Sequence, residues 1–299
     1  MVSLKKSERI SILRGGVSDE KEISILTANQ VFKTLEKKYD TTIIEVGEDC
    51  NKFITDLKNS NPNKVFNCLH GFFGEDGQIQ SFLNYLGIPY THSGVLASSL
   101  AMNKILSKSF YESLGIKCPK TIEKKGALNN NSFPLIAKPI CGGSSNGLVK
   151  IKNNNQLLNF KNKNSSDIFF EEYITGRELT VGILDNKICG IMEIIFEDEL
   201  YDYKNKYVNI AKHLIDPPIS SKIKKEICEI SLTVHNKLNC NCLSRLDFRY
   251  NTISDEVFLL EVNTQPGLTE NSLLPEMAKS KGISFLELCE IILSYARCE

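Results

Sequence analysis

The first 92 residues of the chain alternate short apolar runs with segments in which apolar residues recur every three or four positions. The first run ends at a Gly-Gly pair and leads into such a segment, for which Ser18 or Asp19 can serve as the helix cap. Strands that alternate with helices favour a parallel sheet. The predicted strands are residues 9–13, 42–46 and 65–69, and the predicted helices carry Ile25, Ala28, Phe32 and Leu35 in the first and Ile79, Phe82, Leu83 and Leu86 in the second, which Gly87 would end.

The pattern changes near residue 92, where we place a domain boundary. A single helix with an imperfect apolar stripe is expected to follow, from Leu96 to Leu114. Strand-like runs then dominate until a long amphipathic helix, which Ser220 or Ser221 can cap. The runs are residues 134–140, 168–174 and 179–184, the amphipathic helix carries Ile223, Ile227, Ile230, Val234 and Leu238, and a last helix carries Phe285, Leu288 and Ile292.

Composition narrows the functional classes. The 299 residues carry 36 basic and 36 acidic side chains, so no net charge directs the chain to nucleic acid or to a membrane surface. The apolar stretch after Lys5 and Lys6 stops at Arg14, which argues against an export signal, and no apolar run reaches the roughly 18 residues that span a bilayer. We interpret the ten cysteines, which form no C-x-x-C pair, as reduced and buried side chains of a cytosolic protein, with disulfides or a structural metal as alternatives.

Two strand-like runs flank a polar turn centred near Ser254 and predict a hairpin. A pairing symmetric about that turn sets Asp247 opposite Glu261. Two positions further along, it sets Arg245 opposite Asn263. Because side chains alternate between the two faces of a strand, these four would share one face. The other face would be apolar and packed into the core, with Leu246, Phe248, Leu260 and Val262.

Two carboxylates that face each other across a strand pair destabilise a sheet unless a cation is present. Asp247, Glu261 and the amide oxygen of Asn263 are the ligands that a hard ion such as Mg²⁺ selects. The alternative interpretation is a surface hairpin whose charges are solvated, with Arg245 neutralising the two acids. A different register would remove the argument for a metal.

A glycine-rich stretch follows the strand that ends at Lys138-Pro139. It reads Gly142-Gly143-Ser144-Ser145-Asn146-Gly147, in which backbone N–H groups and serine hydroxyls could approach a phosphate. The stretch is not a Walker loop, and a flexible hairpin loop is the alternative. Lys104, Lys138 and Lys206 could contact a nucleotide, and His70 follows a predicted parallel strand at the edge where ligands usually bind, although single lysines and histidines are more often solvated or structural.

Further motifs follow one another along nearly the whole chain. They are Gly15-Gly16-Val17-Ser18-Asp19-Glu20 with Ser24, His70-Gly71 through Gly74-Glu75-Asp76-Gly77 to Gln80, Ser93-Gly94-Val95, Met102-Asn103-Lys104, Glu171-Glu172-Tyr173-Ile174 before Gly176-Arg177-Glu178, Tyr201-Asp202-Tyr203 before Lys206-Tyr207, Arg245-Leu246-Asp247, and Glu261 to Gly267 with Thr269, Ser272 and Pro275. No single motif is decisive, but their order and spacing together resemble the D-alanine:D-alanine ligases of the ATP-grasp superfamily.

This resemblance implies a mixed α/β (α+β) fold. An N-terminal Rossmann-like parallel-sheet domain (1–92) would precede a central ATP-grasp subdomain (93–174) and a C-terminal catalytic one (175–299), with ATP between the last two. The implied reaction joins two D-alanine molecules at the expense of ATP, through an acylphosphate from which water must be excluded. It serves peptidoglycan precursor synthesis in the cytoplasm, and by analogy the protein is a homodimer. Two Mg²⁺ ions, which Mn²⁺ could replace, are implied as cofactor.

The resemblance also assigns roles to single residues. Arg245 and the backbone N–H of Gly267 would stabilise the acylphosphate and the oxyanion of the tetrahedral intermediate. The metal ligands would be Asp247, Glu261 and Asn263; the ATP contacts Lys104, Lys138, Ser144, Glu171, Glu172, Ile174, Glu178 and Lys206; and the D-alanine contacts Glu20 and His70 for the first molecule and Ser272 and Leu273 for the second.

Glu20, Ser144 and Tyr207 resemble the residues that hydrogen-bond with one another when the site closes. In this family a tyrosine at the position of Tyr207 goes with dipeptide synthesis and a phenylalanine with D-lactate as second substrate, so we expect the dipeptide. The chain departs from the family pattern at Arg14 before Gly-Gly, at Cys141-Gly142 before Gly-Ser-Ser, and over residues 208–218, which include His213.

Other interpretations stay open at this point. The chain could be another ATP-grasp carboxylate–amine ligase with a different amino-acid specificity. It could also be a nucleotide-binding regulatory protein without catalysis, against which the intact set of Arg245, Asp247, Glu261 and Asn263 argues. Zinc and nicotinamide-dependent chemistry would need H-x-x-x-H or G-x-G-x-x-G patterns, which do not occur.

Overall fold

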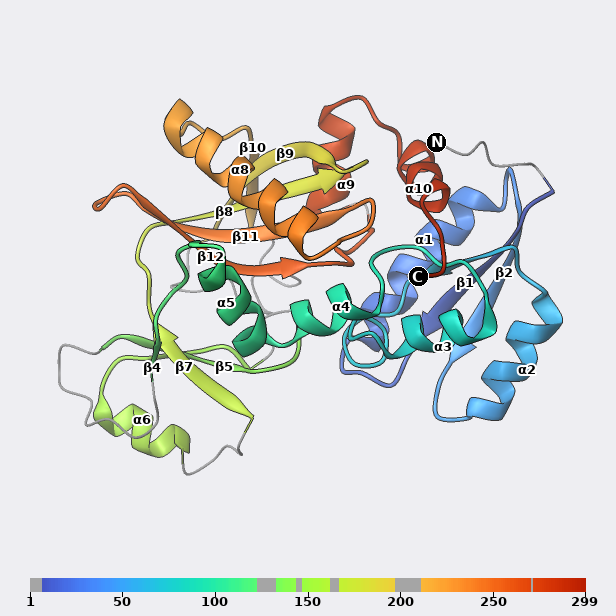
Figure 1. Cartoon of the computed structure of the whole chain (residues 1–299), viewed down its shortest axis with the longest axis horizontal. Helices are drawn as coiled ribbons and strands as arrows, with labels where there is room; N and C mark the ends of the chain where they lie inside the picture. The colour runs from blue at the N-terminus through green and yellow to red at the C-terminus, as the bar shows by residue number, and fades with distance from the viewer. Residues whose placement is uncertain (1–6, 123–132, 144–146, 162–166, 197–210, 270) are drawn as a thin grey trace.

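Three β-sheets form the framework of the computed structural model, which describes residues 7–122, 133–143, 147–161, 167–196, 211–269 and 271–299. In Figure 1 the three-stranded sheet lies at the right, the five-stranded sheet at the upper left and the four-stranded sheet at the lower left. The C-terminus lies near the three-stranded sheet. Helices cover one or both faces of each sheet, as the predicted mixed α/β class requires.

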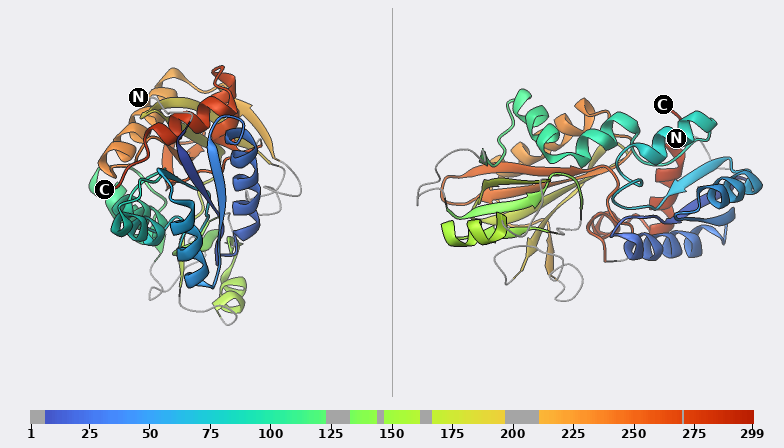
Figure 2. Two further views of the ribbon diagram at one scale, coloured as in Figure 1. Left: turned by 90° about the vertical axis from the view of Figure 1, so that its right-hand side faces the viewer. Right: turned by 90° about the horizontal axis from the view of Figure 1, so that it is seen from below.

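The three-stranded sheet is parallel, with the order β2-β1-β3, which confirms the prediction for this part of the chain. Side chains alternate along β1, so Ile10 and Ile12 join one core and Leu13 joins the core on the other face. Figure 2 shows helices on both sides of these strands. The strands are β1 (Arg9–Gly15), β2 (Asp40–Val46) and β3 (Lys64–Asn67), and the helices after them are α1 (Lys21–Leu35), α2 (Cys50–Ser60) and α3 (Gln78–Leu86).

The last helix of the chain, α10 (Phe285–Ser294), returns to this first sheet. Its residues Leu288, Cys289 and Ile292 share a core with Ile10 and Ile12 of β1. Directly before β2, Tyr39 donates a hydrogen bond of 2.5 Å to the Glu290 carboxylate of α10. The two ends of the chain are therefore packed together by apolar contacts and a polar link.

Helix α1 begins differently from the prediction. Its N-cap is Glu20, without a side-chain cap, so the expected cap by Ser18 or Asp19 is wrong. The Ser18 hydroxyl instead donates to the His70 carbonyl at 2.6 Å and accepts from the Glu20 N–H at 3.2 Å. Ser18 thus ties the loop before α1 to the segment after β3, and this contact between distant parts of the chain competes with local capping.

The single helix expected from Leu96 to Leu114 is also wrong, because it is two helices, α4 (Val95–Met102) and α5 (Lys104–Ser113). Asn103 between them is extended, with ψ 101°, and its side chain accepts hydrogen bonds from the N–H groups of Ile105 and Leu106 at 3.2 and 3.1 Å. Asparagine is among the most favourable N-cap residues. The break makes Lys104 the first residue of α5.

The four-stranded sheet is antiparallel and separates its apolar face from a polar one. Leu135, Ala137 and Phe170 pack under helix α6, whereas Lys138 and Glu171 lie at alternate positions of the same strands. The order is β4-β7-β5-β6, with β4 (Thr121–Ile122), β5 (Leu135–Pro139), β6 (Val149–Ile151) and β7 (Ile168–Glu172), and α6 spans Asn154–Lys161.

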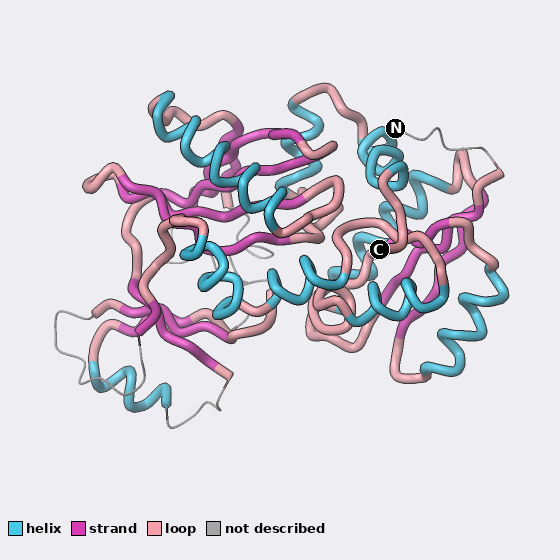
Figure 3. Tube along the Cα trace, viewed as in Figure 1, coloured by secondary structure: helices cyan, strands magenta, loops and turns pink. Residues whose placement is uncertain are grey.

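The five-stranded antiparallel sheet also separates an apolar face from a polar one. Its strand residues Val181, Leu246 and Phe248 pack with Ile227 of the long helix α8, which Ser220 caps as predicted by accepting from the Ile223 N–H at 3.2 Å. Figure 3 shows this helix beside the strands. The order is β10-β9-β8-β11-β12, with β8 (Arg177–Leu184), β9 (Lys187–Ile195), β10 (Lys212–Ile215), β11 (Ser244–Asn251) and β12 (Glu256–Asn263), and the helices are α8 (Ser221–Lys237) and α9 (Leu273–Ser280).

Helix α9 crosses β8 and β9 where both strands have a glycine. Gly182 and Gly190 pair across the ladder, and a Cβ at Gly182 would lie 2.7 Å from Leu274 and from Met277 of α9. Such a distance is far inside van der Waals contact, so the two glycines permit the close approach of the helix. This packing positions the start of α9, which was predicted to hold the second D-alanine.

All ten cysteines are free thiols, and six of them are buried. Burial raises the pKa of Cys240 and of Cys242 to about 12, which keeps both thiols neutral near pH 7. Within the described residues, none of the helices combines the length and the hydropathy that crossing a membrane requires.

Candidate active site

The β11–β12 hairpin has the predicted register at its functional end. Asp247 lies opposite Glu261, and Arg245 lies opposite Asn263. On its other side β11 pairs with β8, where Asp247 lies opposite Thr180. The sheet therefore gathers these side chains on the face that is not covered by α8.

A bulge changes the register beyond Asp247. The pairing shifts by one residue between Asp247 and Phe248, so that Phe248 faces Leu259. Leu259 is fully buried in the core, whereas Leu260 lines the cleft described below. The prediction that Leu260 belongs to the core is therefore wrong, because a strict period of two does not account for the extra residue of a bulge.

An open cleft of about 940 Å³ lies between the polar faces of the four-stranded and the five-stranded sheet. Apolar side chains, among them Ile136, Leu148 and Leu260, line it together with charged ones. The predicted ATP, metal and catalytic residues that line it are Lys104, Lys138, Glu171, Glu172, Ile174, Glu178, Arg245, Asp247 and Glu261.

Donors surround the Asp247 carboxylate. Arg245 donates to it in a bidentate manner, from Nε to Oδ1 at 2.9 Å and from Nη2 to Oδ2 at 2.7 Å. The Thr180 hydroxyl donates to Oδ1 at 2.7 Å and the Asn263 Nδ2 donates to Oδ2 at 3.1 Å. Charge-assisted bidentate bonds are strong and directional, so they hold Asp247 and Arg245 in fixed orientations at the cleft.

The donor chemistry of this region fits a divalent cation. Asp247 and Glu261 are directly opposite in the ladder and both line the cleft, and the Asn263 amide carries an oxygen that it could present in place of Nδ2. In the described part of the chain no group of three or more His, Cys, Asp or Glu side chains could hold a metal ion. The two carboxylates therefore need other oxygens, such as that of Asn263 or those of a bound phosphate, to complete an ion's ligand shell.

Two lysines share one carboxylate on the opposite wall. Glu171 accepts from Lys138 at 2.5 Å through Oε1 and from Lys108 at 2.7 Å through Oε2. All three side chains are less than a tenth exposed. The two ammonium groups also lie over the ring of Phe169, 5.4 and 5.6 Å from its centroid. Glu171 thus lies between two cations and next to the cleft.

Arg249 ties the two sheets together at one end of the cleft. Its Nε donates to the Ile174 carbonyl at 3.2 Å and its Nη2 donates to the Tyr173 hydroxyl at 3.3 Å, both in the segment that joins β7 to β8. Its Nη1 lies 3.4 Å from Glu178 of β8. These contacts fix the backbone that was predicted to meet the adenine.

Lys104 reaches the glycine-rich loop from the start of α5. Its Nζ donates to the Gly142 carbonyl at 2.6 Å and lies 3.8 Å from the Glu261 carboxylate. Its backbone N–H donates to the Ile140 carbonyl at 2.9 Å. The α5 N-terminus, the loop and β12 therefore meet at this lysine.

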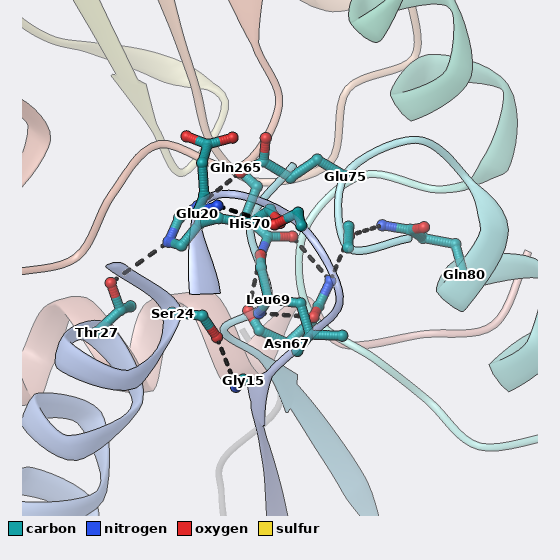
Figure 4. A network of polar contacts seen from close by, with 12 residues as sticks. Gly15, Glu20, Ser24, Thr27, Asn67, Leu69, His70, Glu75, Gln80 and Gln265 are labelled. Atoms are coloured by element: carbon teal, nitrogen blue, oxygen red, sulfur yellow. Dashed lines mark hydrogen bonds and ion pairs between the residues drawn. The ribbon is translucent and has the colours of Figure 1, made fainter. Parts of the chain in front are cut away.

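A second polar region surrounds His70, after the end of β3 (Figure 4). His70 is buried, with Nδ1 2.6 Å from Glu75 and Nε2 3.3 Å from Thr27. Burial acts to lower the pKa of His70, but the hydrogen bond and charge of Glu75 and the charge of Glu20 outweigh it and raise the pKa above its usual value. The carboxylates of Glu75 and Glu20 therefore stabilise the protonated form of the imidazole relative to the neutral form.

Neutral amides connect this region to the C-terminal part of the chain. Asn67 Nδ2 donates to Gln265 Oε1 at 2.9 Å and to the Gly74 carbonyl at 2.9 Å. Gln265 Nε2 donates in turn to the carbonyls of Asn67 and Leu69, the first at 3.2 Å. Figure 4 shows these groups beside His70. Gln265 thus bridges the end of β3 and the segment after β12.

The segment after Gln265 contains Gly267 and leads to α9. Ser272 is the N-cap of α9, and its hydroxyl accepts from the Thr269 N–H at 3.0 Å. A Cβ at Gly267 would lie 3.1 Å from this hydroxyl, and Leu273 behind it is buried. The backbone of Gly267 and the start of α9, both predicted site elements, are therefore adjacent.

The glycine-rich loop approaches Glu20. A Cβ at Gly143 would lie 2.9 Å from Oε2 of Glu20, and a Cβ at Gly71 would lie 2.8 Å from the same atom. The two glycines leave space for this carboxylate between the loop and the segment after β3. The remaining predicted residues, Ser144, Lys206 and Tyr207, lie outside the described residues.

Sequence reasoning gave no role to several residues of these two regions, although most of them carried a signal. Lys108 follows Lys104 by four positions, so the two share one face of α5. Thr180 lies two positions after the predicted residue Glu178 on β8, and Arg249 lies two positions after Asp247 on β11. Each therefore shares a face of its strand with a predicted residue. Asn67 had no such signal, and Gln265 stood only inside the motif from Glu261 to Gly267 without a role, because the pairing of the two residues depends on contacts between distant parts of the chain.

Two antiparallel sheets that face each other across a cleft, with lysines on one face and paired carboxylates and an arginine on the other, define the ATP-grasp class of enzymes. The parallel sheet and the Glu20–His70 region stand at one end of that cleft, beside the glycine-rich loop.

Comparisons with known proteins narrow the class to a family. The family model described as "D-ala D-ala ligase C-terminus" matches residues 113–294, more than half of the chain. The D-alanine–D-alanine ligase of Wolbachia pipientis wMel is 42% identical over 294 residues, which cover 95% of this chain and 93% of that one. That of Pelagibacter ubique (strain HTCC1062) is 43% identical over 304 residues, with 97% and 98% covered. The chain belongs to the D-alanine–D-alanine ligase family.

Solved structures agree with this assignment. The D-alanine–D-alanine ligase from Bacillus anthracis complexed with ATP has a TM-score of 0.82 and 30% identity, with 97% of each chain covered. The ligase from Coxiella burnetii has a TM-score of 0.79 at 24% identity and supports the fold alone. The predicted family and the predicted ATP-grasp fold are therefore confirmed.

Proposed function

We propose that the protein joins two D-alanine molecules to D-alanyl-D-alanine and converts one ATP to ADP and phosphate. The dipeptide is used for peptidoglycan precursors. The observation that carries this function is the set of Arg245, Asp247 and Glu261 on the cleft face, opposite Lys138. A regulatory protein that has lost catalysis would not need two carboxylates directly opposite each other in a strand ladder, because that placement is destabilising without a cation. Family membership makes D-alanine the substrate to test first.

The chemistry assigned to these residues is a pair of displacements. The carboxylate of the first D-alanine attacks the γ-phosphorus of ATP, and ADP leaves. The amine of the second then attacks the acyl carbon of the resulting acylphosphate, loses a proton, and expels phosphate. Arg245, whose guanidinium is held by Asp247, would stabilise the negative charge of both steps, with the Gly267 N–H as a second donor.

The nucleotide would lie between the two antiparallel sheets. Lys104, Lys138 and, by family analogy, Lys206 would contact its phosphates, Ser144 of the glycine-rich loop would cover them, and Glu178 would meet the ribose. Glu171, Glu172 and the Ile174 backbone would meet the adenine. Support comes from the cleft lining, which includes six of these eight residues. Asp247, Glu261 and Asn263 would hold two Mg²⁺ ions, or Mn²⁺, which when bound neutralise charge on the transferred phosphoryl group.

The amino acids would lie at the end of the cleft near Glu20. Glu20 and His70 would receive the first D-alanine, and Ser272 with the Leu273 backbone would bind the carboxylate of the second. The closeness of Gly143 to Glu20 supports a loop that closes over this position with Ser144 and Tyr207. Tyr207 favours an amine rather than a D-lactate hydroxyl as acceptor.

The decisive experiment mixes the purified protein with ATP, Mg²⁺ and D-alanine and identifies the product by mass. We expect D-alanyl-D-alanine and one ADP per dipeptide. Competition between D-alanine and D-lactate at neutral pH should yield the dipeptide, and a dominant depsipeptide would contradict the assignment of Tyr207. A panel of other amino acids tests the alternative, a carboxylate–amine ligase of different specificity, which would release ADP without D-alanine.

Three further proposals rest on the same family. The units would be residues 1–92, 93–174 and 175–299, with α10 packed back on the first. The ten unpaired thiols support a reducing compartment, the cytoplasm. A homodimer, formed through the N-terminal part, would appear in sedimentation equilibrium as twice the mass of 33.6 kDa.

A further inference from the structure

The cluster of Lys108, Lys138 and Glu171 carries one positive charge in excess, because two lysines share one carboxylate. Lys108 and Lys138 each form a short ion pair with it, at 2.7 and 2.5 Å. Side-chain exposure is 4% for Lys108, 9% for Lys138 and 3% for Glu171. Buried charges are stable only when they are paired, so one carboxylate with two cations is an arrangement that calls for a further anion.

The two lysines are not equivalent with respect to the cleft. Lys138 and Glu171 line the cleft, whereas Lys108 lies behind Glu171 and also donates to the Pro119 carbonyl. A ligand in the cleft can therefore contact Lys138 but meets Lys108 only through Glu171. Lys108 lies on helix α5, four residues after Lys104, so this one helix carries both Lys104 and Lys108.

This geometry has a consequence for anion binding. A phosphate that enters the cleft competes with Glu171 for the Lys138 ammonium. If Glu171 had no other partner, the exchange would leave a buried carboxylate unpaired beside a polyanion, which is costly. Because Lys108 keeps its own bond to Oε2, Glu171 retains a counter-charge when Lys138 turns to the phosphate.

We propose that Lys108 is a positioning residue of the nucleotide site, which holds the Glu171 carboxylate in place so that Lys138 can exchange it for a phosphate of ATP. This role deepens the proposed function and rests on ATP binding in the cleft. It concerns nucleotide affinity and leaves the two D-alanine positions, at the other end of the cleft, unaffected.

The test replaces Lys108 by methionine in the full-length protein, which keeps the length of the side chain and removes its charge. ADP and ATP affinity is measured by titration calorimetry, and KM is measured for ATP and for D-alanine. Loss of one charge-assisted hydrogen bond predicts a roughly 10- to 100-fold weaker nucleotide affinity. The KM for D-alanine should change less than about twofold, and Lys108→Arg should restore most of the nucleotide affinity.

Lys117→Met is the matched control. Lys117 forms a 2.6 Å ion pair with Glu256, but the two side chains are 60% and 40% exposed and lie away from the cleft lining. The same chemical change at this exposed pair should leave nucleotide affinity unaltered, because exposed pairs contribute little. An equal loss in both variants would overturn the proposal.

A double-mutant cycle keeps the proposal testable if Lys108→Met does not fold. Without its carboxylate, Glu171→Gln needs no second counter-charge, so adding Lys108→Met to it should weaken nucleotide binding by less than about threefold. A further tenfold loss would show that Lys108 acts independently of Glu171 and would overturn the proposal. Failure of the unaltered protein to bind ADP or ATP would instead contradict the proposed function itself.

Discussion

The nucleotide cleft and the region around His70 use polar side chains in different ways. In the cleft, charged groups pair across or beside open space, as Arg245 does with Asp247 and Lys138 with Glu171. Around His70, the link between the end of β3 and the segment after β12 consists of the neutral amides of Asn67 and Gln265, which are buried and bonded to backbone carbonyls.

This difference predicts which contacts a bound ligand can replace. An ion pair at the edge of a cleft can give up one partner to an incoming anion or cation, because the ligand supplies replacement charge. A buried amide that bonds to carbonyls has no replacement partner, and its loss leaves several groups unsatisfied. We therefore expect changes in the cleft to act mainly on catalysis or affinity and changes in the amide network to act on stability and alignment.

The largest effect should come from Arg245→Ala. Removal of a donor aimed at the developing negative charge predicts a fall in kcat of about 10²- to 10³-fold or more. Nucleotide binding should largely survive, since the lysines of the other wall remain. Steady-state kinetics and ADP titration measure the two quantities, and unchanged turnover would contradict the role of Arg245.

The bulge offers a matched pair of leucines. Leu259→Ala should lower the free energy of unfolding by about 2–5 kcal/mol, because a fully buried leucine leaves a cavity. Leu260→Ala, one residue further on the cleft side, should lower it less and should weaken ATP affinity instead. Urea denaturation measures the stability of both variants, and ATP titration measures their affinity for the nucleotide. Equal losses of stability would mean that Leu260 belongs to the core.

Gln265→Leu should act on stability and on D-alanine together. It leaves the carbonyls of Asn67 and Leu69 without this donor, which predicts a loss of about 1–3 kcal/mol in the free energy of unfolding. The KM for D-alanine should rise, whereas the affinity for ADP should not change. Gln78→Leu, at an exposed glutamine of α3, is the control and should alter neither; a loss of ADP affinity in Gln265→Leu would break the distinction between the regions.

The smallest effect is electrostatic. Glu75→Gln removes the negative charge, and with it the charge-assisted hydrogen bond, that raises the pKa of His70, so the pKa should fall in the variant. In the unaltered protein, the stabilisation from protonated His70 is fully present below pH 6.5, the ordinary value, and is lost as the pH rises through the folded pKa. NMR titration of the imidazole measures the pKa of His70, and unfolding at several pH values measures the pH dependence of stability. A pKa that stays raised in the variant would show that the charge of Glu20 alone is sufficient to raise it.

Much of the framework was predictable because it follows from local rules. The alternation in β11 and β12 predicted the facing of Asp247 and Glu261, and the apolar spacing predicted α1, α3 and α8. The predictions failed where a single residue overrides the pattern. Asn103 caps a new helix inside an apolar stripe, and the bulge after Asp247 moves Leu260 from the core to the cleft.

By itself, the sequence determined the alternating strands and helices, the family and the acidic pair of the hairpin, because periodicity and short motifs are properties of neighbouring residues. Only the tertiary structure decided that Lys108 and Lys138 share Glu171, that Gln265 bridges to Asn67, and that α10 packs on the first sheet. These contacts join residues far apart in the chain, and their geometry depends on how the sheets pack, for which no local pattern carries the information.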